Sequence, residues 1–132
     1  MLVLDVDRLK SLNDSYGHLT GADAVRTVGR LIARHTPPRA VACRFGGDEF
    51  VIAIPNCPMA QGLDIAELLR GSVSEEQPVL AARSFPSGTL SISIGAASRR
   101  VERMRILWRL AKNHSARPTR PYIGLKRWDG TA

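Results

Sequence analysis

Residues 40–54 read Ala-Val-Ala-Cys-Arg-Phe-Gly-Gly-Asp-Glu-Phe-Val-Ile-Ala-Ile. Two apolar runs, residues 40–45 and residues 49–54, flank the sequence Gly46-Gly47-Asp48. Paired glycines between two such runs indicate a tight β-hairpin, because glycine adopts the backbone angles of a short turn without steric cost. The stretch therefore predicts two consecutive antiparallel strands at the centre of the fold.

The residues before this hairpin predict a strand and a helix. Residues 2–6 form a short apolar run that suits a buried strand. Gly17 and Gly21 predict a loop, after which apolar residues recur at helical spacing from residue 25 to the helix breaker at residues 37–38.

The residues after the hairpin predict a helix and two further extended segments. The helix opens at Pro58 and is predicted to end near Gly71. Residues 78–85 predict an edge strand or loop, and a turn at residues 86–88 predicts a second hairpin with the half-buried strand at residues 90–95.

The order of these elements predicts an α/β fold with a ferredoxin-like βαββαβ core and a central hairpin. This arrangement is favoured over a doubly wound parallel sheet because a hairpin joins the second and third strands. We therefore expect a mixed or antiparallel sheet. The chain has 132 residues, which suits a single domain spanning residues 1–132.

The net charge of +7 comes from the C-terminal part of the chain. Residues 99–132 hold ten basic residues against two acidic ones, and their apolar spacing over residues 101–111 predicts a basic amphipathic helix. Such asymmetry indicates an anionic partner, which could be nucleic acid, an acidic membrane surface or a phosphorylated small molecule, or it marks a solvated helix face with a frayed tail.

Composition narrows these classes of partner. Aromatic residues make up 5% of the chain, and no stacking platform of interleaved Phe or Tyr residues lies on the expected strands, so we expect no nucleic-acid partner. No apolar run approaches the roughly 18 residues that a membrane span needs. We therefore expect a cytoplasmic domain with no membrane insertion.

Acidic residues gather at two expected element ends. Asp5 and Asp7 close the first strand, whereas Asp48 and Glu49 lie at the hairpin tip. In a ferredoxin-like fold the first strand end and the central hairpin are neighbours, so Asp5 and Asp48 are expected to lie close together. Consecutive carboxylates repel one another unless a cation or a basic neighbour balances them. The pattern predicts a divalent-metal site.

These same residues carry a resemblance to a known family. Arg44 to Phe50 reads R-F-G-G-D-E-F and Asp5 to His18 reads D-V-D-R-L-K-S-L-N-D-S-Y-G-H, which resembles the GGDEF domain of bacterial diguanylate cyclases. The resemblance covers roughly residues 2–96 and includes the Ser-Ile-Gly of the strand at residues 90–95. It implies a core related to the nucleotidyl cyclase and polymerase palm folds.

The resemblance implies a function in bacterial second-messenger signalling. Two GTP molecules would condense into cyclic di-GMP with loss of two pyrophosphates, each domain of a homodimer holding one GTP. Sensory or output domains would belong to the full-length protein. The alternative is a degenerate GGDEF domain that binds cyclic di-GMP or GTP as a receptor.

The resemblance also implies roles for individual residues. Asp5 and Asp48, with the main-chain carbonyl of Val6, would hold Mg²⁺ or Mn²⁺. Glu49 would be a further metal ligand or the base that helps to deprotonate the ribose hydroxyl. The remaining residues would contact GTP: Lys10 the triphosphate, Asn13 the guanine edge, Gly46 and Gly47 the space for the phosphates, and Lys112, with Arg117, the phosphates from the C-terminal region.

The sequence departs from the family pattern at several positions. Ala22 stands where the family has an aspartate that helps to bind guanine, and loss of such a charged hydrogen bond costs on the order of 1.5–3 kcal/mol unless Asp23 or water substitutes. Residues 37–40 lack the R-x-x-D of the family's product-binding inhibitory site, so we expect no feedback inhibition there. The N-terminal helical segment that precedes the first strand in the family is expected to be missing.

Overall fold

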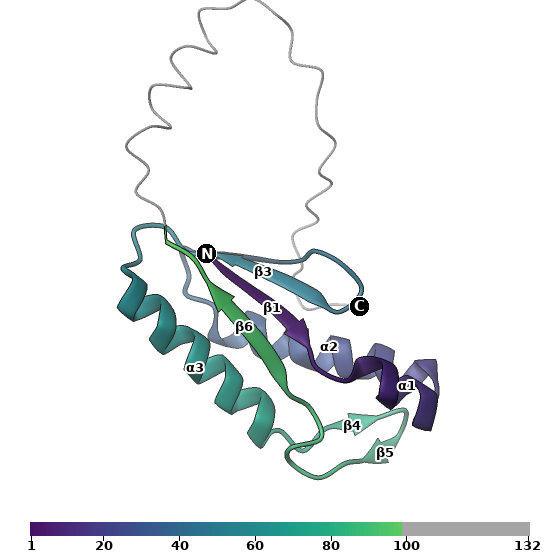
Figure 1. The fold of residues 1–132 in the computed structure, drawn as a ribbon. Helices are drawn as coiled ribbons and strands as arrows, with labels where there is room; N and C mark the ends of the chain where they lie inside the picture. Colours follow the sequence, from purple (N-terminus) through teal and green to yellow (C-terminus); the bar gives the residue numbers. More distant parts are fainter. Residues whose placement is uncertain (99–132) are drawn as a thin grey trace, which may run out of the picture.

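The computed structural model describes residues 1–98 as a four-stranded sheet with helices on one face and a small separate hairpin (Figure 1). The elements in chain order are β1 (Leu2–Val6), α1 (Leu9–Tyr16), α2 (His18–His35), β2 (Val41–Arg44), β3 (Glu49–Ala53), α3 (Met59–Glu75), β4 (Val79–Leu80), β5 (Arg83–Ser84) and β6 (Ile92–Ala96). The predicted helix at residues 101–111 and Lys112 lie outside the described residues.

The sheet has the order β2-β3-β1-β6, and every neighbouring pair is antiparallel. Because β2 and β3 form the predicted hairpin and β1 lies between β3 and β6, the core follows the ferredoxin-like βαββαβ order. The predicted fold class and the central hairpin are confirmed.

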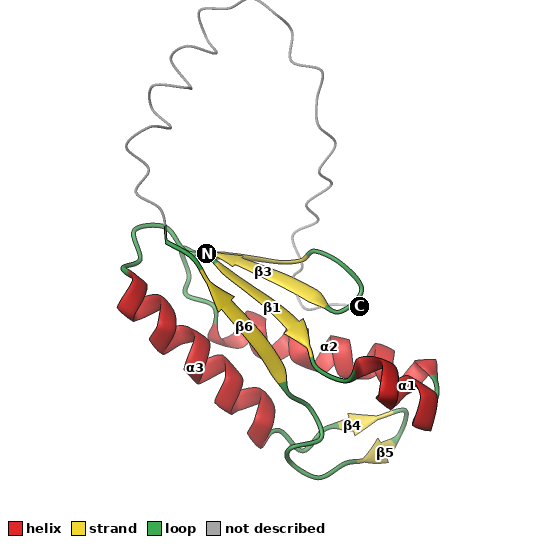
Figure 2. Cartoon of the chain, viewed as in Figure 1, coloured by secondary structure: helices red, strands yellow, loops and turns green. Residues whose placement is uncertain are grey.

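One face of the sheet forms the core. Along β1 the residues alternate, so that Leu2, Leu4 and Val6 are buried while Val3 and Asp5 are exposed. Such alternation is what a strand with one covered face requires. The long helices α2 and α3 pack on the buried face (Figure 2). The acidic residue of β1 therefore projects from the face opposite the helices.

The first helical region differs from the prediction. The structure has no loop between Gly17 and Gly21, because α2 begins at His18, directly after Gly17, and contains Gly21. Gly17 alone makes the break between α1 and α2, with a φ of 88° that favours glycine. Gly21 is needed for a different reason, namely the close approach of a side chain from α1, described below.

The segment after β3 also differs in its boundaries. The helix α3 continues past Gly71 to Glu75, and β6 begins at Ile92. The second hairpin turns at Ala81 and Ala82, joining β4 to β5, so the predicted turn at residues 86–88 is not its turn. The last strand, β6, pairs with β1 instead.

Candidate functional site

The end of β1 and the tip of the β2–β3 hairpin meet at one end of the sheet (Figure 1). The amide of Val6 donates a hydrogen bond to the main-chain oxygen of Asp48 at 3.1 Å. Asp5 on β1 is the antiparallel partner of Glu49 on β3. The expected proximity of Asp5 to the hairpin carboxylates is therefore confirmed.

The neighbouring carboxylates at this end of the sheet disfavour the ionised form of Asp5. Partial desolvation by neighbouring atoms raises the pKa of the Asp5 carboxyl above its usual value, and the nearby carboxylates of Asp48 and Asp7 raise it further. The Asp7 carboxylate accepts a hydrogen bond from the Ser93 hydroxyl at 2.6 Å, which ties it to β6. A cation bound between Asp5 and Asp48 would offset the repulsion between these two carboxylates.

The chemistry of these donors fits a hard divalent ion. Carboxylate and carbonyl oxygens are the ligands that Mg²⁺ prefers, and proteins usually bind this ion through one or two carboxylates together with substrate phosphates and water. Within residues 1–98, no group of three or more His, Cys, Asp or Glu side chains is arranged to hold a metal ion. Asp5 and Asp48 therefore fit an ion that phosphate oxygens complete, rather than a cage built from protein alone.

The hairpin tip is held by Arg44, a residue for which the sequence predicted no role. Its guanidinium donates hydrogen bonds to the main-chain oxygens of Gly46 at 3.0 Å and of Gly47 at 2.5 Å. A Cβ atom on Gly47 would meet nothing within 4 Å, whereas one on Gly46 would lie 2.7 Å from Oε2 of Glu49. The tip is thus fixed from one side and borders open space at Gly47.

The second part of the candidate site lies where α1 packs against α2. Lys10 is exposed on α1, and Asn13 follows one turn later. The side chain of Asn13 lies against Gly21, where an added Cβ would sit 1.9 Å from Asn13 Oδ1. That oxygen is buried and has no hydrogen-bond partner. Within residues 1–98, no hydrogen bond or ion pair joins the side chain of Lys10 or Asn13 to the carboxylates at the hairpin end.

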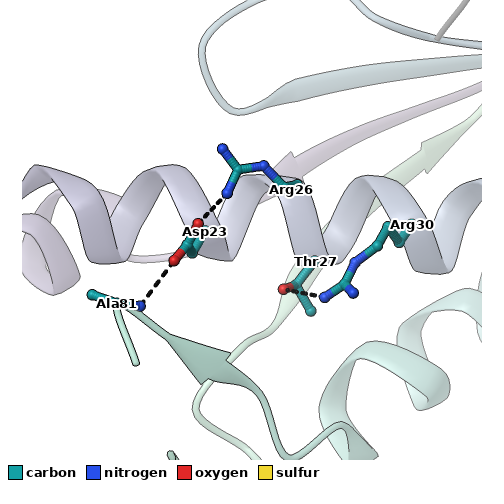
Figure 3. Close-up of polar contacts among 5 residues, drawn as sticks. All are labelled: Asp23, Arg26, Thr27, Arg30 and Ala81. Atoms are coloured by element: carbon teal, nitrogen blue, oxygen red, sulfur yellow. Dashed lines mark hydrogen bonds and ion pairs between the residues drawn. The ribbon is translucent and has the colours of Figure 1, made fainter. Parts of the chain in front are cut away.

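Asp23 has a structural role that the sequence did not indicate. Its Oδ2 accepts a hydrogen bond from the Ala81 amide at 2.9 Å, and its Oδ1 pairs with Arg26 one turn further along α2 (Figure 3). Both carboxylate oxygens of Asp23 therefore have partners within the chain. The contact joins residues 58 positions apart, so no local pattern could have revealed it.

Comparison with known proteins shows the family of this chain. Residues 1–115 match the family model described as "Diguanylate cyclase, GGDEF domain". The chain belongs to the GGDEF domain family. It is 34% identical over 98 residues to the response regulator PleD of Caulobacter vibrioides and 32% identical over 98 residues to diguanylate cyclase A of Treponema denticola. These alignments cover 74% of this chain but only 22% and 26% of the relatives, so the chain spans about a quarter of their length.

Solved structures of GGDEF domains share the fold. The GGDEF domain of DgcB from Caulobacter crescentus, solved in complex with c-di-GMP, has a TM-score of 0.69 and 29% identity, covering 84% of this chain and 70% of that one. The diguanylate cyclase SiaD of Pseudomonas aeruginosa has a TM-score of 0.68 at 22% identity, covering 84% of this chain and 42% of that one, which supports the fold alone. Within the described part of this GGDEF domain, no helix has the length and apolar character to cross a bilayer.

Proposed function

We propose that this GGDEF domain is a diguanylate cyclase that binds GTP with Mg²⁺ or Mn²⁺ and, as a homodimer, condenses two GTP molecules into cyclic di-GMP. The observation that carries the proposal is the pairing of Asp5 with the Asp48 hairpin at one end of the sheet, beside two glycines. In the whole protein we expect a cytoplasmic module that sensory or output domains control.

The oxygen donors at the hairpin end would have two roles, metal binding and proton transfer. Asp5, Asp48 and the carbonyl of Val6 would hold the ion, and Glu49 would be a further ligand or the base for the ribose hydroxyl. When bound, such an ion polarises the α-phosphate and lowers the pKa of the attacking hydroxyl. The chain itself supplies fixed negative charge at Asp5 and Asp48 and open space at Gly47.

The remaining residues would bind the nucleotide. Lys10, exposed on α1, would neutralise the triphosphate as a point charge, and Asn13 would contact the base. Gly46 and Gly47 would border the phosphates. From the resemblance, Lys112 would contact the phosphates from the C-terminal region.

The reaction joins two nucleotides held by two chains. The 3′-oxygen of one GTP forms a bond to the α-phosphorus of the other, the bond from that phosphorus to the bridging oxygen breaks, and pyrophosphate leaves. The proton of the 3′-hydroxyl passes to a base, for which Glu49 is the candidate. The same step in the opposite direction closes the ring and releases the second pyrophosphate.

A receptor is the second candidate function, and the surroundings of Ala22 favour it. Ala22 brings no carboxylate and Asp23 is engaged with Ala81 and Arg26, so guanine binding is weakened relative to the family pattern. A GGDEF domain of this kind would bind GTP or cyclic di-GMP without turnover.

Incubation of the chain with GTP and Mg²⁺ or Mn²⁺, followed by mass spectrometry, tests the cyclase. We expect cyclic di-GMP from the wild type and none from Asp48→Asn, because the variant lacks a metal ligand. Asp64→Asn, which removes an exposed carboxylate from α3, is the matched control and should keep activity. Tight calorimetric binding of cyclic di-GMP with no turnover would establish the receptor instead.

A further inference from the structure

We propose that a groove beside α1 binds a small molecule that combines an apolar group with a carboxylate. The groove consists of two adjoining pockets that share Ser15 and Tyr16. One is the apolar pocket, which Leu12 and Leu90 help to line, and the other is the polar pocket, which Arg83 helps to line. Their volumes are about 260 and 280 Å³, and together they reach the usual size of small-molecule sites, roughly 300–1,000 Å³.

The groove lies on a different side of α1 from the residues that the proposed function assigns to GTP. Ser11 and Ser15 line the groove and are four positions apart, so they share one side of the helix. Lys10 and Asn13 are three positions apart and share another side, and neither lines a pocket of the groove. Of the residues proposed to bind the ion or GTP, Val6 alone borders the groove among the described residues. The groove is therefore a second site.

The apolar pocket suits an aliphatic or aromatic group. Val6, Leu12 and Leu90 bring aliphatic side chains to it, and burial of apolar surface favours binding there. Asp7 and Arg8 line the same pocket with opposite charges. A negatively charged group therefore gains no net attraction in this pocket.

The polar pocket suits a carboxylate. The Arg83 guanidinium lies 5.5 Å from the centroid of the Tyr16 ring, and this cation–π contact holds it beside the pocket. Within residues 1–98, Arg83 forms no ion pair, and no acidic residue lines the polar pocket. A guanidinium can donate two parallel hydrogen bonds to one carboxylate, and the Ser15 hydroxyl is a further donor.

Contacts within the chain hold the walls of the polar pocket in place. The Tyr16 ring packs edge-on against Phe85, with ring centroids 5.1 Å apart. The Ala81 amide donates a hydrogen bond to Asp23 at 2.9 Å, and the charge of Asp23 is balanced by Arg26 (Figure 3). A pocket formed before the ligand arrives costs less to order on binding. The geometry thus favours a carboxylate at Arg83 with its apolar group in the adjoining pocket.

The probe 3-phenylpropionate tests the inference, because it carries a ring two carbons from a carboxylate. An NMR titration of the 132-residue chain without nucleotide is expected to show saturable shifts of the Ser15, Tyr16 and Arg83 amides, with a dissociation constant on the order of 1 mM. The neutral 3-phenylpropanamide should bind about five- to tenfold more weakly, since it lacks the charge. Propionate lacks the ring and should bind more weakly by about tenfold or more.

Substitutions assign the two ends of the probe. Arg83→Gln should weaken binding of 3-phenylpropionate by about five- to tenfold and leave binding of the amide unchanged, because only the acid pairs with the guanidinium. Ser11→Phe should weaken both ligands, because its ring would fill the apolar pocket. Arg34→Gln is the matched control, since it removes an exposed arginine of α2 that lines neither pocket, and it should change neither constant.

Three results would overturn the inference. The first is equal binding of the acid and the amide by the wild type, and the second is an Arg83→Gln variant that binds the acid as tightly as Arg34→Gln does. The third is a titration in which no amide around the groove shifts, or in which the shifts are confined to residues 46–49. Because the comparison of acid with amide needs only the wild type, it decides the question even where a variant does not fold.

Discussion

The Asp5 carboxylate carries a free-energy cost in the ionised form. Its pKa is raised by partial desolvation and by the carboxylates of Asp48 and Asp7, so the folded chain binds the Asp5 proton more tightly than the unfolded chain does. The unfolded value is the ordinary 3.8. Folding stability from this group is therefore greatest below that value and falls as the pH rises through the raised folded pKa.

Asp5→Asn should consequently raise the melting temperature at pH 7, because it removes the charge that the folded state disfavours. We also expect the melting temperature of the variant to change less with pH than that of the wild type just above pH 3.8. Thermal unfolding followed by circular dichroism measures both effects. Added Mg²⁺ should stabilise the wild type and not the variant, since only a folded site binds the ion. An unchanged or lower melting temperature for the variant at pH 7 would contradict the inferred repulsion between Asp5 and the carboxylates of Asp48 and Asp7.

Gly21 is required by the contact between α1 and α2. Gly21→Ala would place its Cβ 1.9 Å from Asn13 Oδ1, so the Asn13 side chain must leave its position. We expect a loss of about 1–3 kcal/mol in the free energy of unfolding, as for overpacking elsewhere, together with weakened nucleotide binding.

Gly71→Ala is the matched control for this substitution. Gly71 lies inside α3, and an added Cβ there meets nothing within 4 Å. Alanine should stabilise this helix by about 0.5–1 kcal/mol. Urea denaturation of both variants provides the measurement, and the same sign of change in both would contradict the proposed close approach.

At the scale of elements, the β4–β5 hairpin is strained at its turn. Ala81 and Ala82 have φ values of 48° and 62°, where alanine is disfavoured and Asn-Gly is the preferred pair. The amide of Ala81 is held by Asp23 of α2, which helps to keep the turn in place. The double substitution Ala81→Asn with Ala82→Gly should therefore stabilise the fold by about 1–2 kcal/mol in urea denaturation. Ala60→Gly, in the first turn of α3, tests for a general effect of glycine and should be destabilising.

The sequence predicted the β2–β3 hairpin correctly but placed the turn of the second hairpin at the wrong residues, and the chemistry of the two turns explains the difference. Gly46 and Gly47 between apolar runs carry the turn signal for β2–β3, whereas the two-alanine turn of β4–β5 carries none and depends on a contact with α2. The same difference between local signals and distant contacts applies to the candidate site residues. Asp5 and Asp48 were predicted as neighbours because topology brings a strand end to a hairpin, but the engagement of Asp23 depends on packing between distant segments.

At the scale of the whole molecule, the helices α2 and α3 cover one face of the sheet, and the candidate donors gather at one end of it. The described residues provide one carboxylate pair, Asp5 and Asp48, at the β2–β3 hairpin and one candidate base-binding residue, Asn13, where α1 packs against α2. This set suits a single nucleotide, whereas cyclic di-GMP contains two guanylate units. The proposed reaction therefore requires two chains to bring their nucleotides together.

This requirement predicts how the rate of product formation depends on protein concentration. Below the dissociation constant of the dimer, the rate should rise with the square of the chain concentration, because two GTP-loaded chains must meet; above it the rate should become proportional to concentration. Mass spectrometry of cyclic di-GMP over a dilution series measures how the rate depends on chain concentration. As a control, two copies of the chain joined by a long flexible linker should give a rate proportional to concentration at every dilution, since the partner is then always at high effective concentration. A linear dependence for the unlinked chain at every dilution, with sedimentation showing a monomer, would mean that one chain holds both nucleotides. That result would contradict the proposal that each chain holds one.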